Sequence, residues 1–311
     1  MGCLLGELVW GLVVIGNPTR RTFMGAAASA LLLSGCRPGA DPSLVPALTE
    51  TQPVSPSSPP ADPHPAVETI PPAPVPKTVL SRQQVVARFG GVVPSYWGLE
   101  APGVVRILSA SAIALTLDYC GGPGGSAVDH TILDMLQRYQ VPATLFVNSR
   151  WIEANPVLAR DLAAVPFFEL ANHGTGHLPL SVNGNSAYGI AGTRNTGEIY
   201  DEIMGNDEVL AELTGERPRF FRPGTAYLDN VATQICHALD VVPVGFSVNA
   251  DGGATFPAAT VADIVGRAQP GDVIICHGNQ PRSGTGAGLV RAVPQLLDKG
   301  YVIATLGAGV P

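Results

Sequence analysis

From about Ser81 onward, short apolar runs alternate with stretches of helical periodicity, and this alternation constrains the fold more than any other feature of the chain. The runs are rich in β-branched or aromatic residues, as buried strands are: IALTLD, ATLFV, FFELA, RFFRP, VPVGFSV, DVIICH and YVIATL. Helix-like stretches such as HTILDMLQRYQ lie between several of them. Strands that alternate with helices pair in parallel, so we predict one α/β domain over residues 81–311.

Polar side chains stand where several of these predicted strands end. Asp118 ends IALTLD, Arg222 ends RFFR, and His277 ends VIICH. Asp251 follows FSVNA, and the segment NHGTGH follows FFELA. In a β/α barrel, the carboxyl ends of the strands carry the catalytic groups. One such residue alone is more often a cap or a turn residue, but five sites at the same end of successive strands predict a functional site.

The segment NHGTGH holds two histidines, His173 and His177, four residues apart. On a helix the two rings would share a face, but Gly174 and Gly176 disfavour a helix. On a strand they would stand roughly 13 Å apart, too far for one metal ion. A glycine-rich turn can direct both rings to one point. Taken alone, the segment fits either such a site or two polar loop histidines.

In their order and spacing, these residues resemble the polysaccharide deacetylases, carbohydrate esterase family 4, over about residues 112–306. Five segments correspond to the five motifs of the family: Thr116–Tyr119, His173–His177, Phe221–Gly224, Ser247–Asp251 and Ile274–His277. The resemblance implies an incomplete β/α barrel (NodB-type) of about seven parallel strands. It also implies removal of N-acetyl groups from a cell-envelope glycan, such as peptidoglycan or another N-acetylhexosamine polymer.

The resemblance further implies a role for each polar residue. His173 and His177 would bind one divalent metal, most commonly zinc, with cobalt or nickel as alternatives. Asp118 would act as the base toward water, and His277 would give a proton to the leaving amine. Arg222 would keep Asp118 ionised through a charge-assisted pair.

Asp251 is the predicted partner that orients His277, as a carboxylate often does for an imidazole. The family's own aspartates in this motif correspond more naturally to Asn249 and Gly252, so Asp251 departs from the pattern.

The predicted partner is the N-acetylated glycan itself. Pro223 and Gly224, which follow the arginine of the third motif, are predicted to contact it. Asn279, just beyond the acid, is predicted either to contact the glycan or to brace its own loop. The formal net charge is −7 and no basic patch is present, so nucleic acid is not an expected partner.

Tyr119 is the main departure from the family, because the corresponding residue there is the aspartate that serves as third metal ligand. A neutral phenol is a poorer ligand than a carboxylate. Three outcomes are open: Tyr119 turns away and leaves two histidines and waters to bind metal weakly, it binds metal as a phenolate, or the domain has lost metal and turnover and keeps only a glycan-binding cleft. The following segment CGGPGG (residues 120–125) is flexible enough to bring its backbone close to an ion or to a substrate.

The N-terminal part resembles an export signal. Arg20 and Arg21 form a twin-arginine pair, and the apolar run AAASALLLSG after them is too short to span a bilayer. The run leads to Cys36 in a lipoprotein-like box, which predicts a signal over residues 1–36 and a lipid anchor outside the cytoplasm, in the cell envelope. Residues 37–80 are rich in Pro, Ser and Ala, and this composition predicts a disordered tether.

Three cysteines fall within the predicted domain: Cys120, Cys236 and Cys276. An odd number allows at most one disulfide among them. Because Cys120 and Cys276 both adjoin proposed catalytic residues, we expect either that they pair and brace the site or that they are buried small hydrophobic residues.

Overall fold

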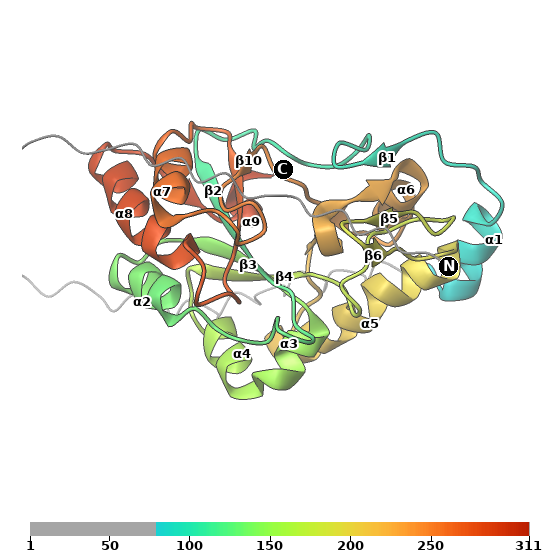
Figure 1. The fold of residues 1–311 in the computed structure, drawn as a ribbon. Helices are drawn as coiled ribbons and strands as arrows, with labels where there is room; N and C mark the ends of the chain where they lie inside the picture. Colours follow the sequence, from blue (N-terminus) through green and yellow to red (C-terminus); the bar gives the residue numbers. More distant parts are fainter. Residues whose placement is uncertain (1–78, 311) are drawn as a thin grey trace, which may run out of the picture. The chain divides into compact units, whose positions relative to one another are not determined.

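Seven parallel strands curled into a half-barrel form the centre of the computed structural model, which describes residues 79–310 (Figure 1). The strand order is β10-β11-β2-β3-β4-β7-β9, and β12 pairs with the start of β2. The strands are β2 (Ile113–Tyr119), β3 (Ala143–Val147), β4 (Phe168–Asn172), β7 (Phe220–Phe221), β9 (Val242–Pro243), β10 (Val248–Asn249), β11 (Val273–His277) and β12 (Ile303–Ala304). The predicted incomplete β/α barrel of about seven parallel strands is confirmed. The predicted export signal, the lipidation site at Cys36 and the tether up to residue 78 lie outside the described residues.

Helices cover the outside of the sheet (Figure 1). In one group α8 contacts both α2 and α7, and in another α5 contacts both α3 and α4. The helices are α1 (Arg82–Phe89), α2 (His130–Arg138), α3 (Ser149–Ala154), α4 (Pro156–Ala163), α5 (Thr196–Thr214), α6 (Asn230–Ala238), α7 (Ala258–Gly266), α8 (Thr285–Asp298) and α9 (Leu306–Gly309). Several begin where a side-chain oxygen accepts a hydrogen bond from the first turn, as Asp129 does for α2 and Asn195 for α5.

Smaller elements border the sheet. The pair β1 (Trp97–Gly98) and β8 (Leu228–Asp229) is antiparallel, and β5 (Ser186–Ala187) forms a hairpin with β6 (Ile190–Ala191). A short 3-10 turn, η1 (Gly224–Ala226), follows β7.

The alternation of side chains along β2 determines which of them face the interior of the barrel. Ile113, Leu115, Leu117 and Tyr119 pack in the outer core beneath the helices. Ala114 lies in the inner core, which other strands fill with Phe146, Ala171, Phe220 and Val273. Thr116 and Asp118 point to the same inner side, where both contact Arg222. The inner face of β2 therefore becomes polar toward its carboxyl end.

The segment from Val105 to Leu108 spans the open side of the half-barrel. The amide of Val105 donates to the carbonyl of Pro243 at β9, and the amide of Leu108 donates to the carbonyl of Gly271 before β11. One segment that precedes β2 thereby connects the edge strand β9 with the start of β11.

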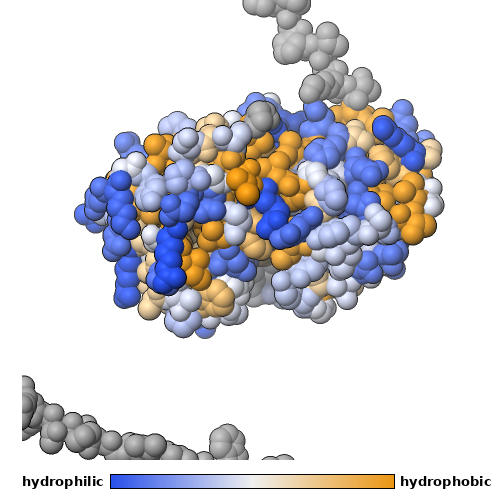
Figure 2. Space-filling view, turned by 90° about the horizontal axis from the view of Figure 1, so that it is seen from above, coloured by the Kyte–Doolittle hydropathy of each residue, from blue (hydrophilic) through white to orange (hydrophobic). Residues whose placement is uncertain are grey.

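Among residues 79–310, no helix combines the length and the apolar character needed to span a membrane. The face in Figure 2 carries apolar patches interrupted by hydrophilic residues.

Candidate active site

Asp118 and Arg222 form a buried ion pair across the barrel interior. Arg222 Nη1 lies 2.7 Å from Asp118 Oδ1, and both side chains are almost fully inaccessible to solvent. The guanidinium also donates to Thr116 Oγ1 at 2.8 Å and to the carbonyl of Gly245 at 2.8 Å, and it lies 4.2 Å from the centre of the Phe146 ring. These contacts hold the guanidinium in place against Asp118 Oδ1, which leaves Oδ2 as the oxygen available for chemistry.

Asp118 is held in its ionised form. Burial raises the pKa of this carboxyl, but the positive charge of Arg222, followed by His173 and His277, outweighs burial and keeps the pKa below its usual value. A carboxylate at this position can therefore accept a proton near neutral pH.

His277 lies next to Asp118, because the two are register partners on β11 and β2. Its Nδ1 faces Asp251 Oδ1 at 3.1 Å, and the backbone amide of His277 donates to Asp251 Oδ2 at 2.7 Å. Thr285 also donates to that oxygen at 2.9 Å. Burial lowers the pKa of His277, but Asp251 and Cys120 outweigh it and raise the pKa well above its usual value. Because Nδ1 faces Asp251, Nε2 is the nitrogen of His277 that points away from this carboxylate and can give a proton.

The loop after β4 brings His173 and His177 together. Their ring centres lie 4.8 Å apart, with Gly174 at a φ of 78° and His177 itself at 60°, both in the left-handed region. His173 Nδ1 lies 2.8 Å from the carbonyl of Arg222, so this nitrogen carries the proton that the carbonyl accepts. In the neutral ring, His173 Nε2 is then the nitrogen with the lone pair that a metal can accept, and it lies 3.7 Å from Asp118 Oδ2.

Residues that the sequence analysis did not single out hold this loop in place. Asn148 Nδ2 donates to the carbonyls of His173 at 2.9 Å and Gly174 at 2.6 Å. Glu202 of α5 is buried and accepts from the amide of Gly176 at 2.8 Å. No motif marks either residue, since they meet the loop only in the folded chain.

The structure places Tyr119 away from the two histidines, which corrects the prediction of Tyr119 as third metal ligand. Its ring is fully buried in the outer core, 4.6 Å from the ring centre of Trp151 and closely packed on Gly278. The hydroxyl has no hydrogen-bond partner, and burial raises the pKa of the phenol further above its usual value. Tyr119 therefore turns away from the histidines, which argues against the second outcome, a phenolate ligand.

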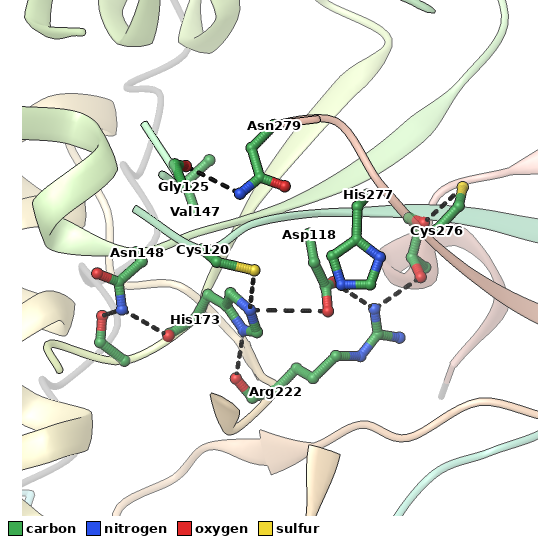
Figure 3. Close-up of polar contacts among 12 residues, drawn as sticks. Asp118, Cys120, Gly125, Val147, Asn148, His173, Arg222, Cys276, His277 and Asn279 are labelled. Carbon is green, nitrogen blue, oxygen red and sulfur yellow. Dashed lines mark hydrogen bonds and ion pairs between the residues drawn. The ribbon is translucent and has the colours of Figure 1, made fainter. Parts of the chain in front are cut away.

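Cys120 lies beside His173 instead (Figure 3). Its Sγ lies 3.8 Å from His173 Nε2, and one ligand atom from each of Cys120, His173 and His177 lies within 4.8 Å of the others. Burial raises the pKa of the thiol, but hydrogen bonds to the neighbouring histidines outweigh it and bring the pKa well below its usual value. One thiolate and two imidazoles are a donor set that suits zinc.

The predicted disulfide between Cys120 and Cys276 is absent, and both thiols are free. Cys276 precedes His277 on β11 and so points to the opposite face, into the outer core, with Sγ 3.5 Å from the carbonyl oxygen of Thr116. Figure 3 shows the two sulfur atoms on opposite sides of the site. The alternative prediction, a buried small hydrophobic residue, fits Cys276 and also Cys236.

A cleft of about 410 Å³ opens onto these groups. Asp118, His177 and His277 line it, together with more apolar residues: Tyr188, Ile190, Thr225, Phe246, Asn249, Gly252, Gly253 and Ile275. It therefore presents a base, an acid and one imidazole of the histidine pair to a single bound molecule.

The three predicted substrate contacts do not line this cleft. Pro223 and Gly224 are buried, and Gly224 packs against the carbonyl of His177 so closely that a Cβ there would collide with it. Asn279 is buried as well and braces the glycine-rich loop by donating to the carbonyl of Gly125 at 2.8 Å. Thr225, the next residue along from Gly224, lines the cleft in their place.

Residues 106–244 match the family model described as polysaccharide deacetylase. This part of the chain belongs to the polysaccharide deacetylase family. The uncharacterized protein YlxY of Bacillus subtilis is 24% identical over 176 residues, which cover 56% of this chain and 50% of YlxY. The chain thus spans about half the length of that relative.

Two solved structures share the fold of this deacetylase domain. The Bc1960 peptidoglycan N-acetylglucosamine deacetylase is 26% identical with a TM-score of 0.55, covering 66% of this chain and 91% of its own. BA3943 from Bacillus anthracis, described as a CE4 family pseudoenzyme, is 19% identical with a TM-score of 0.56, covering 68% and 70% of the two chains. At that lower identity, the likeness to BA3943 concerns the fold alone.

Replacing Tyr119 by Phe tests its placement in the outer core of the deacetylase domain. The change removes an unpaired buried hydroxyl, so we expect the free energy of unfolding to rise by about 1 kcal/mol and zinc affinity to stay the same. Denaturant unfolding and zinc titration measure the two quantities. A loss of zinc affinity of about tenfold or more would show instead that the phenol acts at the metal.

Replacing Asp251 by Asn tests the pairing that protonates His277. A general acid must carry its proton, so the rate falls as the pH rises through the pKa of His277. Without the carboxylate this pKa is lower, and the alkaline fall in kcat should move to lower pH. The pH profile of acetate release measures the shift, with Asp263→Asn, in an exposed pair on α7, as the matched control. If the alkaline limb of the pH profile is the same in Asp251→Asn as in the native chain, Asp251 does not raise the pKa of His277.

Proposed function

We propose that this chain removes N-acetyl groups from a cell-envelope glycan in a metal-dependent hydrolysis. The observation that carries the proposal is the placement of Asp118 and His277 side by side on neighbouring strands, both facing one cleft beside His177. Their surroundings shift the two pKa values in opposite directions, down for Asp118 and up for His277. Opposite protonation states in adjacent groups are what an acid and a base of one reaction require.

His173 and His177 are the proposed metal ligands, and zinc is the proposed metal. The fit rests on donor chemistry: Nε2 of His173 has a free lone pair because Nδ1 donates to the carbonyl of Arg222. A bound divalent metal supplies polarisation of the acetyl oxygen and makes water more acidic.

Asp118 and His277 each carry out one of the two proton transfers. Asp118 takes a proton from the attacking water at Oδ2, because Arg222 occupies Oδ1. His277 gives its Nε2 proton to the amide nitrogen as the carbon–nitrogen bond breaks, and Asp251 stabilises the charged ring meanwhile. Water and amide become acetate and a protonated amine, so both protons of the water end on the nitrogen, and Asp118 and His277 return to their starting protonation states.

A wall of aromatic rings supports a sugar polymer as the substrate. Tyr188 lies in the β5–β6 turn, lines the cleft and is 75% exposed. Its ring meets Tyr227 edge-on at 5.4 Å between centres, and Trp97 lies 5.8 Å from Tyr227. Such rings provide rigid apolar area for the C–H faces of hexosamine units. The fold and sequence likeness to the Bc1960 peptidoglycan deacetylase supports peptidoglycan as that polymer.

Acetate release tests the proposed reaction. The full-length chain, incubated with peptidoglycan or another N-acetylated glycan, should release acetate; a chelator should abolish the release and added zinc restore it. His277→Ala should lower kcat by about 10²–10⁴-fold while metal stays bound. Glycan binding that survives the chelator, with no acetate under any metal, would support instead a non-catalytic glycan-binding lipoprotein.

Replacing Tyr188 by Ala tests the aromatic wall. Loss of one aromatic contact should raise KM for a long glycan by about two- to tenfold, matching about 0.5–1.5 kcal/mol, with kcat little changed. Tyr139→Ala, at an exposed tyrosine after α2, is the matched control. Equal KM values for the two variants contradict a sugar contact at Tyr188.

We also propose that the enzyme works from the outer face of a membrane, anchored through a lipid on Cys36. The support is the order of the twin arginines, the apolar run and the cysteine in the sequence. Cys36→Ala should move the protein from the membrane fraction to the soluble fraction of lysed cells. Full retention of that variant in the membrane fraction contradicts a lipid anchor on Cys36.

A further inference from the structure

Cys120 lies where the family has no cysteine among its metal ligands, and strand geometry explains how it reaches the site. Asp118 faces the barrel interior and Tyr119 the outer core, so the next residue returns to the inner side. Gly121 and Gly122 follow with φ values of 68° and 73°, and a Cβ at Gly121 would collide with the backbone of Trp151. The glycines thus let the chain turn sharply enough to leave the thiol beside the histidines.

The distance between Cys120 and His173 matches that of two ligands of one metal ion. A tetrahedral zinc ion, with bonds of about 2.3 Å to sulfur and about 2.0–2.1 Å to nitrogen, places the two kinds of donor about 3.6 Å apart. Cys120 Sγ and His173 Nε2 are 3.8 Å apart, and all three donors lie within 4.8 Å of one another. The free lone pair of His173 is on the nitrogen that faces the sulfur.

We infer that Cys120 is the third protein ligand of the metal, so that a thiolate and two imidazoles hold the ion. This inference rests on the metal site of the proposed function. A thiolate carries the same single negative charge as a carboxylate, so the exchange keeps the net charge of the site. It makes the site softer, which favours zinc or cobalt over magnesium or manganese.

The surroundings of the thiol favour a ligand over a nucleophile. Asp118, His177 and His277 line the cleft, whereas Cys120 does not. A nucleophile must reach the acetyl carbon in the cleft, while a ligand need only reach the ion beside the histidines. His277 Nδ1 already pairs with Asp251, which suits a proton donor to the leaving amine.

Cobalt spectroscopy tests the inference without any turnover. The full-length chain, stripped of metal and kept reduced, is titrated with cobalt(II) chloride. Visible d–d bands report cobalt in a protein site, and near-ultraviolet thiolate-to-cobalt charge transfer reports a bound cysteine. We expect the d–d bands and the charge-transfer band in the native chain. In Cys120→Asp the charge-transfer band should be lost and the d–d bands retained. The controls Cys236→Ala and Cys276→Ala should keep the d–d bands and the charge-transfer band.

A second measurement needs no variant. Iodoacetamide labelling, mapped to each cysteine by peptide mass spectrometry, should modify Cys120 in the metal-free chain and slow markedly there when zinc is bound. Cobalt bound without charge transfer, or equal labelling of Cys120 with and without zinc, overturns the inference and leaves the proposed function standing. Failure to bind cobalt at all overturns both.

Discussion

The buried pair between Arg222 and Asp118 is the interaction on which the rest of the site depends. A guanidinium with no solvent exposure is tolerable only because Asp118, Thr116 and two backbone carbonyls accept its hydrogen bonds. The pair joins β7 to β2 across the barrel, and the backbone carbonyl of Arg222 also orients His173. Removing one partner of such a pair costs about 3–5 kcal/mol in comparable cases, because the other charge is left buried alone. One arginine therefore sets the charge of the proposed base Asp118, the tautomer of the proposed metal ligand His173 and the closeness of two strands.

Two neighbouring residues at the end of β2 account for the departure of this chain from the family pattern. Tyr119, directly after Asp118, faces the helices and packs its ring in the outer core. The residue after it, Cys120, can face the histidines. The site thus offers an anionic donor even though the expected aspartate is missing. The likeness to the pseudoenzyme BA3943 concerns the fold and does not decide whether this chain is active. In the proposed reaction, activity depends on whether Cys120, His173 and His177 bind a metal.

Much of the architecture follows from the sequence, because alternation of strands and helices leaves few folds and because barrel strands present their carboxyl ends together. Position in the motifs pointed to Tyr119 as a ligand, whereas alternation along IALTLDYC places Asp118 and Cys120 on one face and Tyr119 on the other. Glu202 carries no such signal, since its contact with the histidine loop exists only after α5 packs against it. The role of Gly224 was equally hidden, because a tight approach to a carbonyl is visible only in three dimensions.

The central claim is that the histidine loop after β4 forms a working metal site, and the zinc content of the purified full-length chain tests it most directly. Elemental analysis should find about one zinc per chain, as expected for a single site with these donors, and almost none in His173→Ala. His237→Ala, at a histidine of α6 outside the cluster, should keep its zinc. Absence of zinc from the native chain, even after incubation with excess zinc salt, would contradict the account.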